Sequence, residues 1–185
     1  MPTPAKTSLP ELIDIGRTLV DEGGADALTV SAVAQGAGVK APSLYKHFTD
    51  RAALLKAVEI SILKDLEATL RAETKGRTPR VRLRSMADSY RRFAKTQPQR
   101  YALLYGHDAL ADPIIVEACR VAAQPLLEEL RAAGIAETRM LPLARTITAF
   151  LHGFVSMEIA HAFRLGGDLE ADFAASVETI LQGVG

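Results

Sequence analysis

The segment from residue 36 to residue 56 concentrates side chains suited to contacting phosphate oxygens and the edges of nucleic-acid bases. Lys40 and Lys46 supply cations, and Ser43 and Tyr45 supply hydroxyl groups that donate hydrogen bonds. Four basic residues stand against one acidic residue in this segment. Since binding to duplex DNA depends largely on neutralising phosphates, this local excess matters more than the zero net charge of the whole chain.

Two short helices are expected to position these side chains. Thr29 suits the start of the first helix, because its hydroxyl accepts backbone N–H bonds, and apolar residues follow it at steps of three and four. Gly38 is expected to end that helix in the left-handed conformation. Pro42 suits the first turn of the second helix, which Leu44 and Phe48 anchor. The pattern predicts a helix-turn-helix whose second helix enters the major groove.

The same segment resembles the amino-terminal signature of the tetracycline-repressor (TetR) family, in which a Tyr-x-x-Phe pair is the most specific part. The residues that carry the resemblance are Thr29, Val33-Ala34, Ala37-Gly38-Val39, Leu44-Tyr45-Lys46-His47-Phe48, Asp50-Arg51 and Leu54-Leu55. The resemblance covers about residues 9 to 56. Leu151-His152-Gly153 also resembles the Trp-His-Gly element of one carboxy-terminal subgroup, with leucine in place of tryptophan.

The resemblance implies a ligand-responsive, homodimeric transcriptional repressor that binds a palindromic double-stranded DNA operator. Lys40, Ala41 and Ser43 are expected at base edges. The family pattern assigns the phosphate contacts to Thr29, Tyr45, Lys46, His47 and Arg51. Lys40 stands where the family usually has a small capping hydroxyl residue, and Arg51 stands where lysine is common. Neither departure removes a positive charge from the predicted DNA-binding surface.

The composition favours an all-α fold with a three-helix helix-turn-helix head at residues 1–55 and a helical ligand-binding and dimerisation domain at residues 56–185. Tryptophan is absent and alanine and leucine dominate. We find no alternating run of β-branched residues bounded by turns. Caps and breakers predict helices over about 9–22, from Asp50 to Lys75-Gly76, over 79–96, 101–106, 112–134 with a kink or break at Pro125, 142–165, and from Asp168 onward.

The last two predicted helices carry the dimer prediction. The helix predicted at 142–165 is apolar around most of its circumference, so it must be buried on both sides. With the stripe of the final helix, it looks like half of an intermolecular four-helix bundle. The predicted interface residues are Val155, Ile159, Phe163, Phe173, Val177 and Ile180.

A small, largely apolar effector is expected inside the second domain, as the resemblance implies. Methionine and aromatic side chains adapt to irregular apolar guests. The residues predicted to line its cavity are Met86, Tyr90, Phe93, Phe150, Phe154 and Met157. Residues 71 to 100 hold ten basic and two acidic residues, and this excess is expected to form a solvated face and linker.

The sequence shows no catalytic or metal-binding pattern. It contains no His-x-x-x-His pair, no Gly-x-Ser-x-Gly and no phosphate-binding glycine loop after a strand, so we expect no metal, no cofactor and no enzymatic activity. Cys119 is the only cysteine and excludes an intrachain disulfide. Without a signal peptide or an uninterrupted apolar span, the chain is expected in the cytoplasm and not in a membrane.

Two other functions stay open. A dimeric helical interaction module with a degenerate DNA-binding head would share the fold, but the presence of Tyr45, Lys46 and His47 disfavours it. An all-helical enzyme would need a catalytic constellation that forms only in three dimensions.

Overall fold

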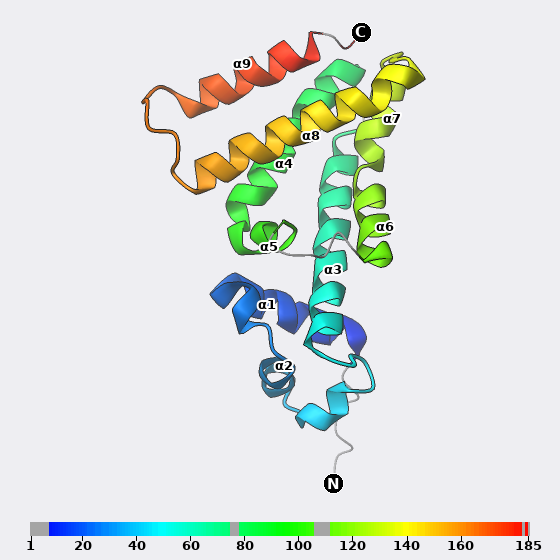
Figure 1. Ribbon diagram of the computed structural model, residues 1–185, viewed down its shortest axis with the longest axis vertical. Coiled ribbons are helices and arrows are strands. Elements are labelled where there is room, and N and C mark those ends of the chain that lie inside the picture. Colours follow the sequence, from blue (N-terminus) through cyan, green and yellow to red (C-terminus); the bar gives the residue numbers. More distant parts are fainter. Residues whose placement is uncertain (1–7, 75–77, 106–111, 183, 185) are drawn as a thin grey trace. The chain divides into compact units, whose positions relative to one another are not determined.

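The computed structural model describes residues 8–74, 78–105, 112–182 and 184, and every regular element in these ranges is helical. This confirms the predicted all-α fold (Figure 1). The elements are α1 (Leu9–Ala27), α2 (Val30–Gly36), the short 3-10 helix η1 (Ala41–Leu44), α3 (Arg51–Ala72), α4 (Pro79–Thr96), α5 (Pro98–Leu103), α6 (Pro113–Ala122), α7 (Gln124–Ala132), α8 (Glu137–Ile159) and α9 (Leu169–Leu181).

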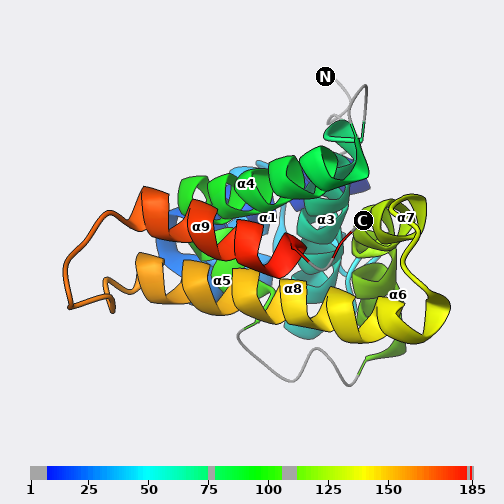
Figure 2. The same ribbon diagram turned by 90° about the horizontal axis from the view of Figure 1, so that it is seen from above.

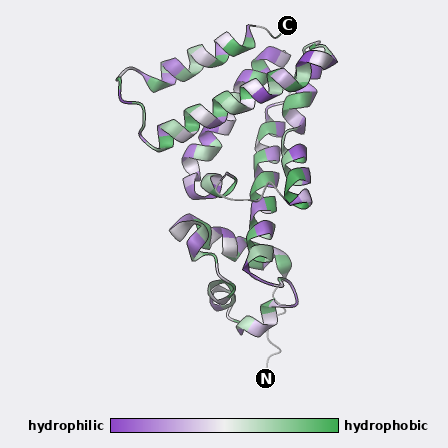
Figure 3. Cartoon of the chain, viewed as in Figure 1, coloured by the Kyte–Doolittle hydropathy of each residue, from purple (hydrophilic) through white to green (hydrophobic). Residues whose placement is uncertain are grey.

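The helices form two compact units. Unit 1 comprises Met1–Lys64 and Gln97–Ala118, and unit 2 comprises Asp65–Thr96 and Cys119–Gly185. Figure 3 shows that helices of both units carry hydrophobic and hydrophilic residues in alternation. Such amphipathic helices bury one face and leave the other to solvent. Among the helices of the described ranges, none has the length and apolar character needed to cross a membrane.

In unit 1, α1 is fixed by its start and by close packing. The Ser8 side chain accepts a hydrogen bond from Glu11 N, and the Glu11 carboxylate accepts one from Ser8 N, which is a capping box. The end predicted for the first helix, near residue 22, is present as an interruption of α1 at Gly24, where φ is 68°. One more helical turn follows and ends at Ala27. A Cβ on Gly16 would lie 2.8 Å from Val58 Cγ2, so α1 approaches α3 closely at this residue.

Helix α3 starts as predicted, because the Asp50 carboxylate accepts a hydrogen bond from Ala53 N at 2.8 Å. Among its buried residues, a row that recurs every four positions comprises Leu54, Val58, Ile62, Leu66 and Leu70. The division between the units falls after Lys64, so the first turns of α3 belong to unit 1 and the last turns to unit 2.

In unit 2, α4 packs against α7, α8 and α9, and α7 also packs against α8. Figure 2 shows α9 between α4 and α8 in that view. The break predicted at Pro125 is confirmed, since α6 ends at Ala122 and α7 begins at Gln124. Burial of Leu83, Leu130 and Leu151 places the core of this unit between these helices.

The predicted end of helix 142–165 is wrong. Helix α8 begins earlier, at Glu137, and ends at Ile159. The reason lies at His161, which adopts a φ of 51° while Ala162 N donates to Met157 O at 2.8 Å. A left-handed residue with such a hydrogen bond ends a helix, so Gly166-Gly167 is not needed for that purpose.

Candidate functional sites

The first helix of the predicted helix-turn-helix is built as its sequence indicates. Thr29 Oγ1 accepts a hydrogen bond from Ala32 N at 3.1 Å and caps the start of α2. Gly38 follows the helix with a φ of 65°, and Val39 N donates to Ala34 O at 3.0 Å. The predicted cap and the predicted glycine stop are both confirmed.

The second helix of the motif is shorter than predicted. Only Ala41–Leu44 forms a 3-10 helix, and a turn follows it through His47. Lys40 precedes the helix without a side-chain cap, because its ammonium cannot accept a hydrogen bond from the first N–H groups. Phe48 N donates to Leu44 O at 2.9 Å, and the buried Leu44 and Phe48 side chains anchor the segment.

The polar side chains of this recognition segment, residues 40–47, are mostly open to solvent. Lys40, Ser43, Tyr45 and Lys46 are exposed, with Tyr45 57% exposed. Ala41, His47 and the capping Thr29 are half-buried. The segment therefore presents two ammonium groups and two hydroxyl groups on one short stretch of backbone.

His47 combines a half-buried ring with an unsatisfied nitrogen. Its Nε2 is buried and has no hydrogen-bond partner among the residues that the structure describes. A buried polar atom without a partner costs free energy, so a ligand that reaches this nitrogen gains from satisfying it.

Arg51 is engaged inside the head. Its Nε donates to Leu28 O at 2.8 Å and its Nη2 donates to Ala25 O, so the guanidinium meets the carbonyl groups at the end of α1. A cation is favourable there, since the last carbonyl groups of a helix are unsatisfied and carry partial negative charge. These bonds tie the first residue of α3 to the residues just before the α2 cap.

The residues predicted to line an effector cavity lie in different surroundings. Met86, Tyr90 and Phe93 are buried on α4, whereas Met157 is 44% exposed on α8. Phe150 and Phe154 are half-buried and belong to an aromatic cluster with Phe163 and Phe173. A small apolar crevice touches Phe150 but none of the other five.

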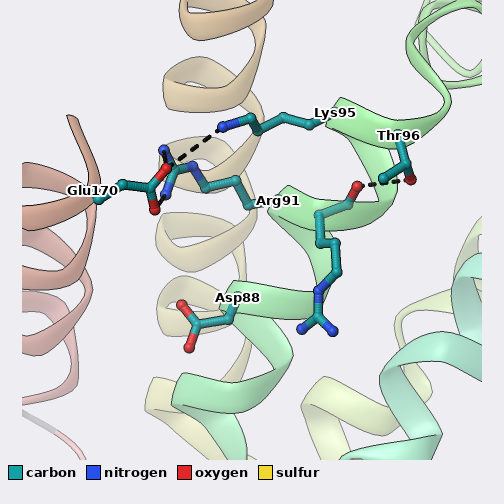
Figure 4. Close-up of a pocket in the computed structure, with 6 residues that line it drawn as sticks. Asp88, Arg91, Lys95, Thr96 and Glu170 are labelled. Atoms are coloured by element: carbon teal, nitrogen blue, oxygen red, sulfur yellow. Dashed lines mark hydrogen bonds and ion pairs between the residues drawn. The ribbon is translucent and has the colours of Figure 1, made fainter.

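A larger cavity of about 520 Å³ lies elsewhere in unit 2 and is strongly charged (Figure 4). We call it the charged cavity. Its lining residues come from α4 and from the first turn of α9, and they are Asp88, Arg91, Arg92, Lys95, Thr96 and Glu170.

Arg91 organises this cavity although it is only 6% exposed. Its Nε and Nη2 donate to the two carboxylate oxygens of Glu158, both at 2.7 Å. Its Nη1 and Nη2 donate to Glu170 at 2.6 and 2.9 Å. Its Cζ lies 4.7 Å from the centre of the Phe173 ring. The hydrogen bonds that Arg91 donates lower the pKa of Glu158, and the same bonds, accepted by Glu158 and to a smaller extent by Glu170, raise the pKa of Arg91.

This cluster was not predicted, and the expectation of a solvated basic face is wrong for Arg91. The cause is that its partners lie far along the chain, 67 residues away at Glu158 and 79 residues away at Glu170. Two features of the sequence point to it. Arg91 directly follows Tyr90 on the inward stripe of α4, and Glu158 interrupts the apolar stretch of α8.

The lowered pKa of Glu158 predicts an acid-sensitive unit 2. An acidic group with a folded-state pKa below its ordinary value of 4.5 stabilises the fold above that value, and the stabilisation is lost as the pH falls through the lower pKa. The melting temperature is expected to fall between about pH 5 and pH 3. Glu158→Gln should lose less on acidification than the parent protein, and equal losses in thermal scans would contradict this role.

The predicted dimer residues are largely covered by the chain itself. Val155, Phe173 and Val177 are at most 4% exposed in the single chain. Ile159, Phe163 and Ile180 are half-buried. Half of the predicted interface residues therefore belong to the core of unit 2.

The other side of α8 is open. Ala149 and Met157 are exposed, and a Cβ built on Gly153 would have no heavy atom within 4 Å. On α9, Ala171, Ala175 and Thr179 are exposed at four-residue spacing. We call these residues the small-residue face.

Comparison with known proteins shows the family. Residues 12–58 match the family described as bacterial regulatory proteins, tetR family, and residues 83–180 match the tetracyclin repressor-like C-terminal domain. The HTH-type transcriptional regulator Rv0681 of Mycobacterium tuberculosis is 33% identical over 160 residues, which cover 84% of this chain and 72% of that protein.

Solved structures share the fold over nearly the whole chain. A protein of unknown function from Rhodococcus sp. RHA1 superimposes with a TM-score of 0.82 and 25% identity, covering 99% of both chains. A TetR variant from Acinetobacter baumannii AYE in complex with minocycline gives a TM-score of 0.72 and 24% identity, covering 96% of both chains. Members of this family are transcriptional regulators and not enzymes. The helix-turn-helix geometry and both family matches lead to one conclusion: the chain belongs to the TetR family and is a DNA-binding transcriptional regulator.

Proposed function

We propose that the protein is a homodimeric repressor, acting in the cytoplasm, whose two heads bind a palindromic operator and whose operator affinity changes when a small effector binds in unit 2. The observation that carries the DNA-binding part is the recognition segment, where Lys40, Ser43, Tyr45 and Lys46 are exposed next to a correctly capped α2. Two-fold symmetry of the dimer is matched by two-fold symmetry of the operator.

The exposed groups suggest a division of roles. Lys40, Ala41 and Ser43 begin the segment and are proposed to meet base edges, since the first residues of a recognition helix enter the groove. We propose phosphate contacts for Tyr45 and Lys46. We propose them also for Thr29, His47 and Arg51. For His47, the unsatisfied Nε2 supports a bond to the backbone of DNA after a change of ring orientation.

For Arg51 we propose a positioning role in addition to its charge. The hydrogen bonds to Leu28 O and Ala25 O hold the residues that lead into α2. Its side chain remains 46% exposed, so the outer edge of the guanidinium can still face a phosphate.

We propose that the homodimer forms through α8 and α9, with the small-residue face in contact with the partner. Half-buried Ile159, Phe163 and Ile180 can join this contact, while Val155, Phe173 and Val177 support it from inside the chain. Small residues let two helices approach closely, and paired helices from two chains form a four-helix bundle. The family match supports a dimer, since TetR-family regulators act as dimers.

The effector is proposed to bind in unit 2. The related TetR variant was solved with minocycline, which supports a small-molecule site in this fold. An apolar effector among Met86, Tyr90 and Phe93 would require these buried side chains to separate. The charged cavity needs no such opening.

Replacing Lys46 tests the DNA-binding surface. Lys46→Gln should weaken binding to every duplex and lower the slope of log affinity against log salt by about 0.9, the contribution of one phosphate contact. Lys64→Gln, which removes the same charge from an exposed position on α3, is the matched control and should keep the parent slope. Fluorescence anisotropy with a labelled duplex over a salt series measures the affinity and the salt slope of each variant.

Equal slopes for Lys46→Gln and the parent protein would remove Lys46 from the interface. If Lys40→Gln and Tyr45→Phe also left affinity unchanged, the head would not be the DNA-binding surface. That outcome would favour the interaction-module alternative.

A further inference from the structure

We propose that the charged cavity is a binding site for the carboxylate of a small organic acid, which takes the place of Glu170 on Arg91. This inference rests on the proposed function, because it names the chemical class of the effector. It replaces the expectation of a largely apolar effector.

The cavity already shows how a carboxylate is held. Arg91 donates two hydrogen bonds to the Glu170 carboxylate, through Nη1 and Nη2, and Lys95 Nζ lies 3.6 Å from Glu170 Oε1 (Figure 4). Two parallel N–H bonds from a planar guanidinium are the preferred geometry for a carboxylate. A carboxylate from solution would find the same donors already in position.

Glu158 and Glu170 differ in how easily they can leave Arg91. The Glu158 side chain is 10% exposed and receives hydrogen bonds from both Arg91 and Lys95, so it stays as the fixed counter-ion. The Glu170 side chain is 72% exposed and can turn into water. The departing and the incoming groups are both carboxylates that accept the same hydrogen bonds from Arg91, so the exchange costs little net free energy.

The departure of Glu170 leaves the start of α9 capped. Asp168 Oδ1 accepts hydrogen bonds from Glu170 N at 2.9 Å and from Ala171 N at 3.3 Å, and neither bond involves the Glu170 side chain. The first turn of α9 therefore keeps its backbone partners while the side chain is displaced.

The charges and the volume favour a monocarboxylate with a short organic tail. Three cations, Arg91, Arg92 and Lys95, face three carboxylates, Asp88, Glu158 and Glu170. Removing Glu170 leaves one positive charge in excess, which one ligand carboxylate balances. A volume of about 520 Å³ exceeds the space of a carboxylate alone and lies in the range of ligand pockets, so a tail can rest on the alkyl stems of Arg92 and Lys95.

Hexanoate, with hexanol as its uncharged counterpart, probes the site by isothermal titration calorimetry on the full chain. The parent protein should bind hexanoate saturably and hexanol at least tenfold more weakly, because loss of a charge-assisted hydrogen-bond pair costs about 1.5–3 kcal/mol, or about 10- to 150-fold. Binding of hexanol as tight as that of hexanoate would overturn the proposal, as would absence of saturable hexanoate binding to both the parent and Glu170→Gln.

Two variants and one control locate the site. Glu170→Gln removes the competing carboxylate and should tighten hexanoate binding about two- to fivefold, the equivalent of an exposed ion pair. Lys95→Gln should weaken it by a similar factor. Arg139→Gln, an exposed charge at the start of α8, should change nothing. Weaker binding by Glu170→Gln, or equal effects of Lys95→Gln and Arg139→Gln, would place the ligand elsewhere.

Operator binding without ligand is measured on the same proteins and separates this inference from the proposed function. If the parent protein binds its operator but neither it nor Glu170→Gln binds hexanoate, the acid site alone is contradicted. A protein that binds hexanoate at this cavity but no DNA contradicts the operator-binding proposal and leaves the acid site supported.

Discussion

Replacing Gly153 with glutamate is expected to convert the dimer into monomers and to weaken operator binding by about 10²- to 10⁴-fold, the gain that two linked heads have over one. In the single chain, a Cβ at Gly153 meets no heavy atom within 4 Å, so a side chain can start at this position without displacing a neighbour in unit 2. In the proposed dimer, the small-residue face is covered, and a carboxylate there would be buried without a partner.

Glycine at position 153 destabilises helix α8 relative to alanine, which would be compensated if a partner helix required the space that a Cβ would fill. In the middle of a helix, glycine is about 1 kcal/mol less favourable than alanine. Gly153→Ala is therefore expected to raise the stability of the monomer, yet to weaken the dimer where α8 approaches its partner closely. A more stable monomer together with a weaker dimer would be hard to explain unless a partner contacts Gly153.

For Gly153→Glu, light scattering measures the conversion to monomers and gel shift measures the loss of operator affinity, with Ala132→Glu as the control. Ala132 is exposed on α7, and its replacement adds the same charge away from the small-residue face. A Gly153→Glu protein that remains a dimer with the operator affinity of the parent would rule out this face as the interface.

The second large effect is expected at the buried ion pair of unit 2. Arg91→Met should lower the free energy of unfolding by about 3 kcal/mol, the lower end of the 3–5 kcal/mol cost of breaking a buried pair. The lower end applies because Lys95 Nζ still lies 2.7 Å from Glu158 Oε1 and compensates part of the buried charge. Methionine keeps most of the apolar contact with Phe173. The change in the free energy of unfolding therefore reflects the lost charge more than lost packing.

For a chain of this size, about 3 kcal/mol corresponds to a fall of about 6–12 °C in melting temperature. Arg139→Met removes an exposed charge from α8 and should change it by less than about 2 °C. The double variant Arg91→Met/Glu158→Met should regain most of the loss, since an apolar pair leaves no buried charge. No recovery in the double variant would mean that packing, and not the charge, explains the effect of Arg91→Met.

Features set by neighbouring residues were predictable from the sequence. Thr29, Asp50 and Asp168 each cap a helix as predicted, because a cap depends on one side chain and N–H groups two or three residues later. Gly38 takes the predicted left-handed conformation for the same local reason. These local signals were sufficient to define the helix-turn-helix and the family resemblance.

Features set by residues far apart were not predictable. The periodicity of Val155, Phe173 and Val177 indicates burial, but it cannot distinguish the core of one chain from a contact between two chains. Arg51 was assigned to phosphate by its position in the motif, and its bonds to Leu28 O and Ala25 O depend on the end of α1 more than twenty residues earlier. The Arg91 cluster joins three helices. Arg91 and Glu158 each stand out within their own segment, but nothing in the sequence indicates that they pair with each other.

Selection of bound duplexes from a random-sequence library tests the central claim most directly, which is that two identical heads of this protein read an operator. The account predicts enrichment of one palindrome whose half-sites lie about 10 base pairs, or a multiple of that, from centre to centre. The Gly153→Glu protein should enrich single half-sites at most. Enrichment of no sequence by the parent protein, or of a motif without two-fold symmetry, would contradict the account.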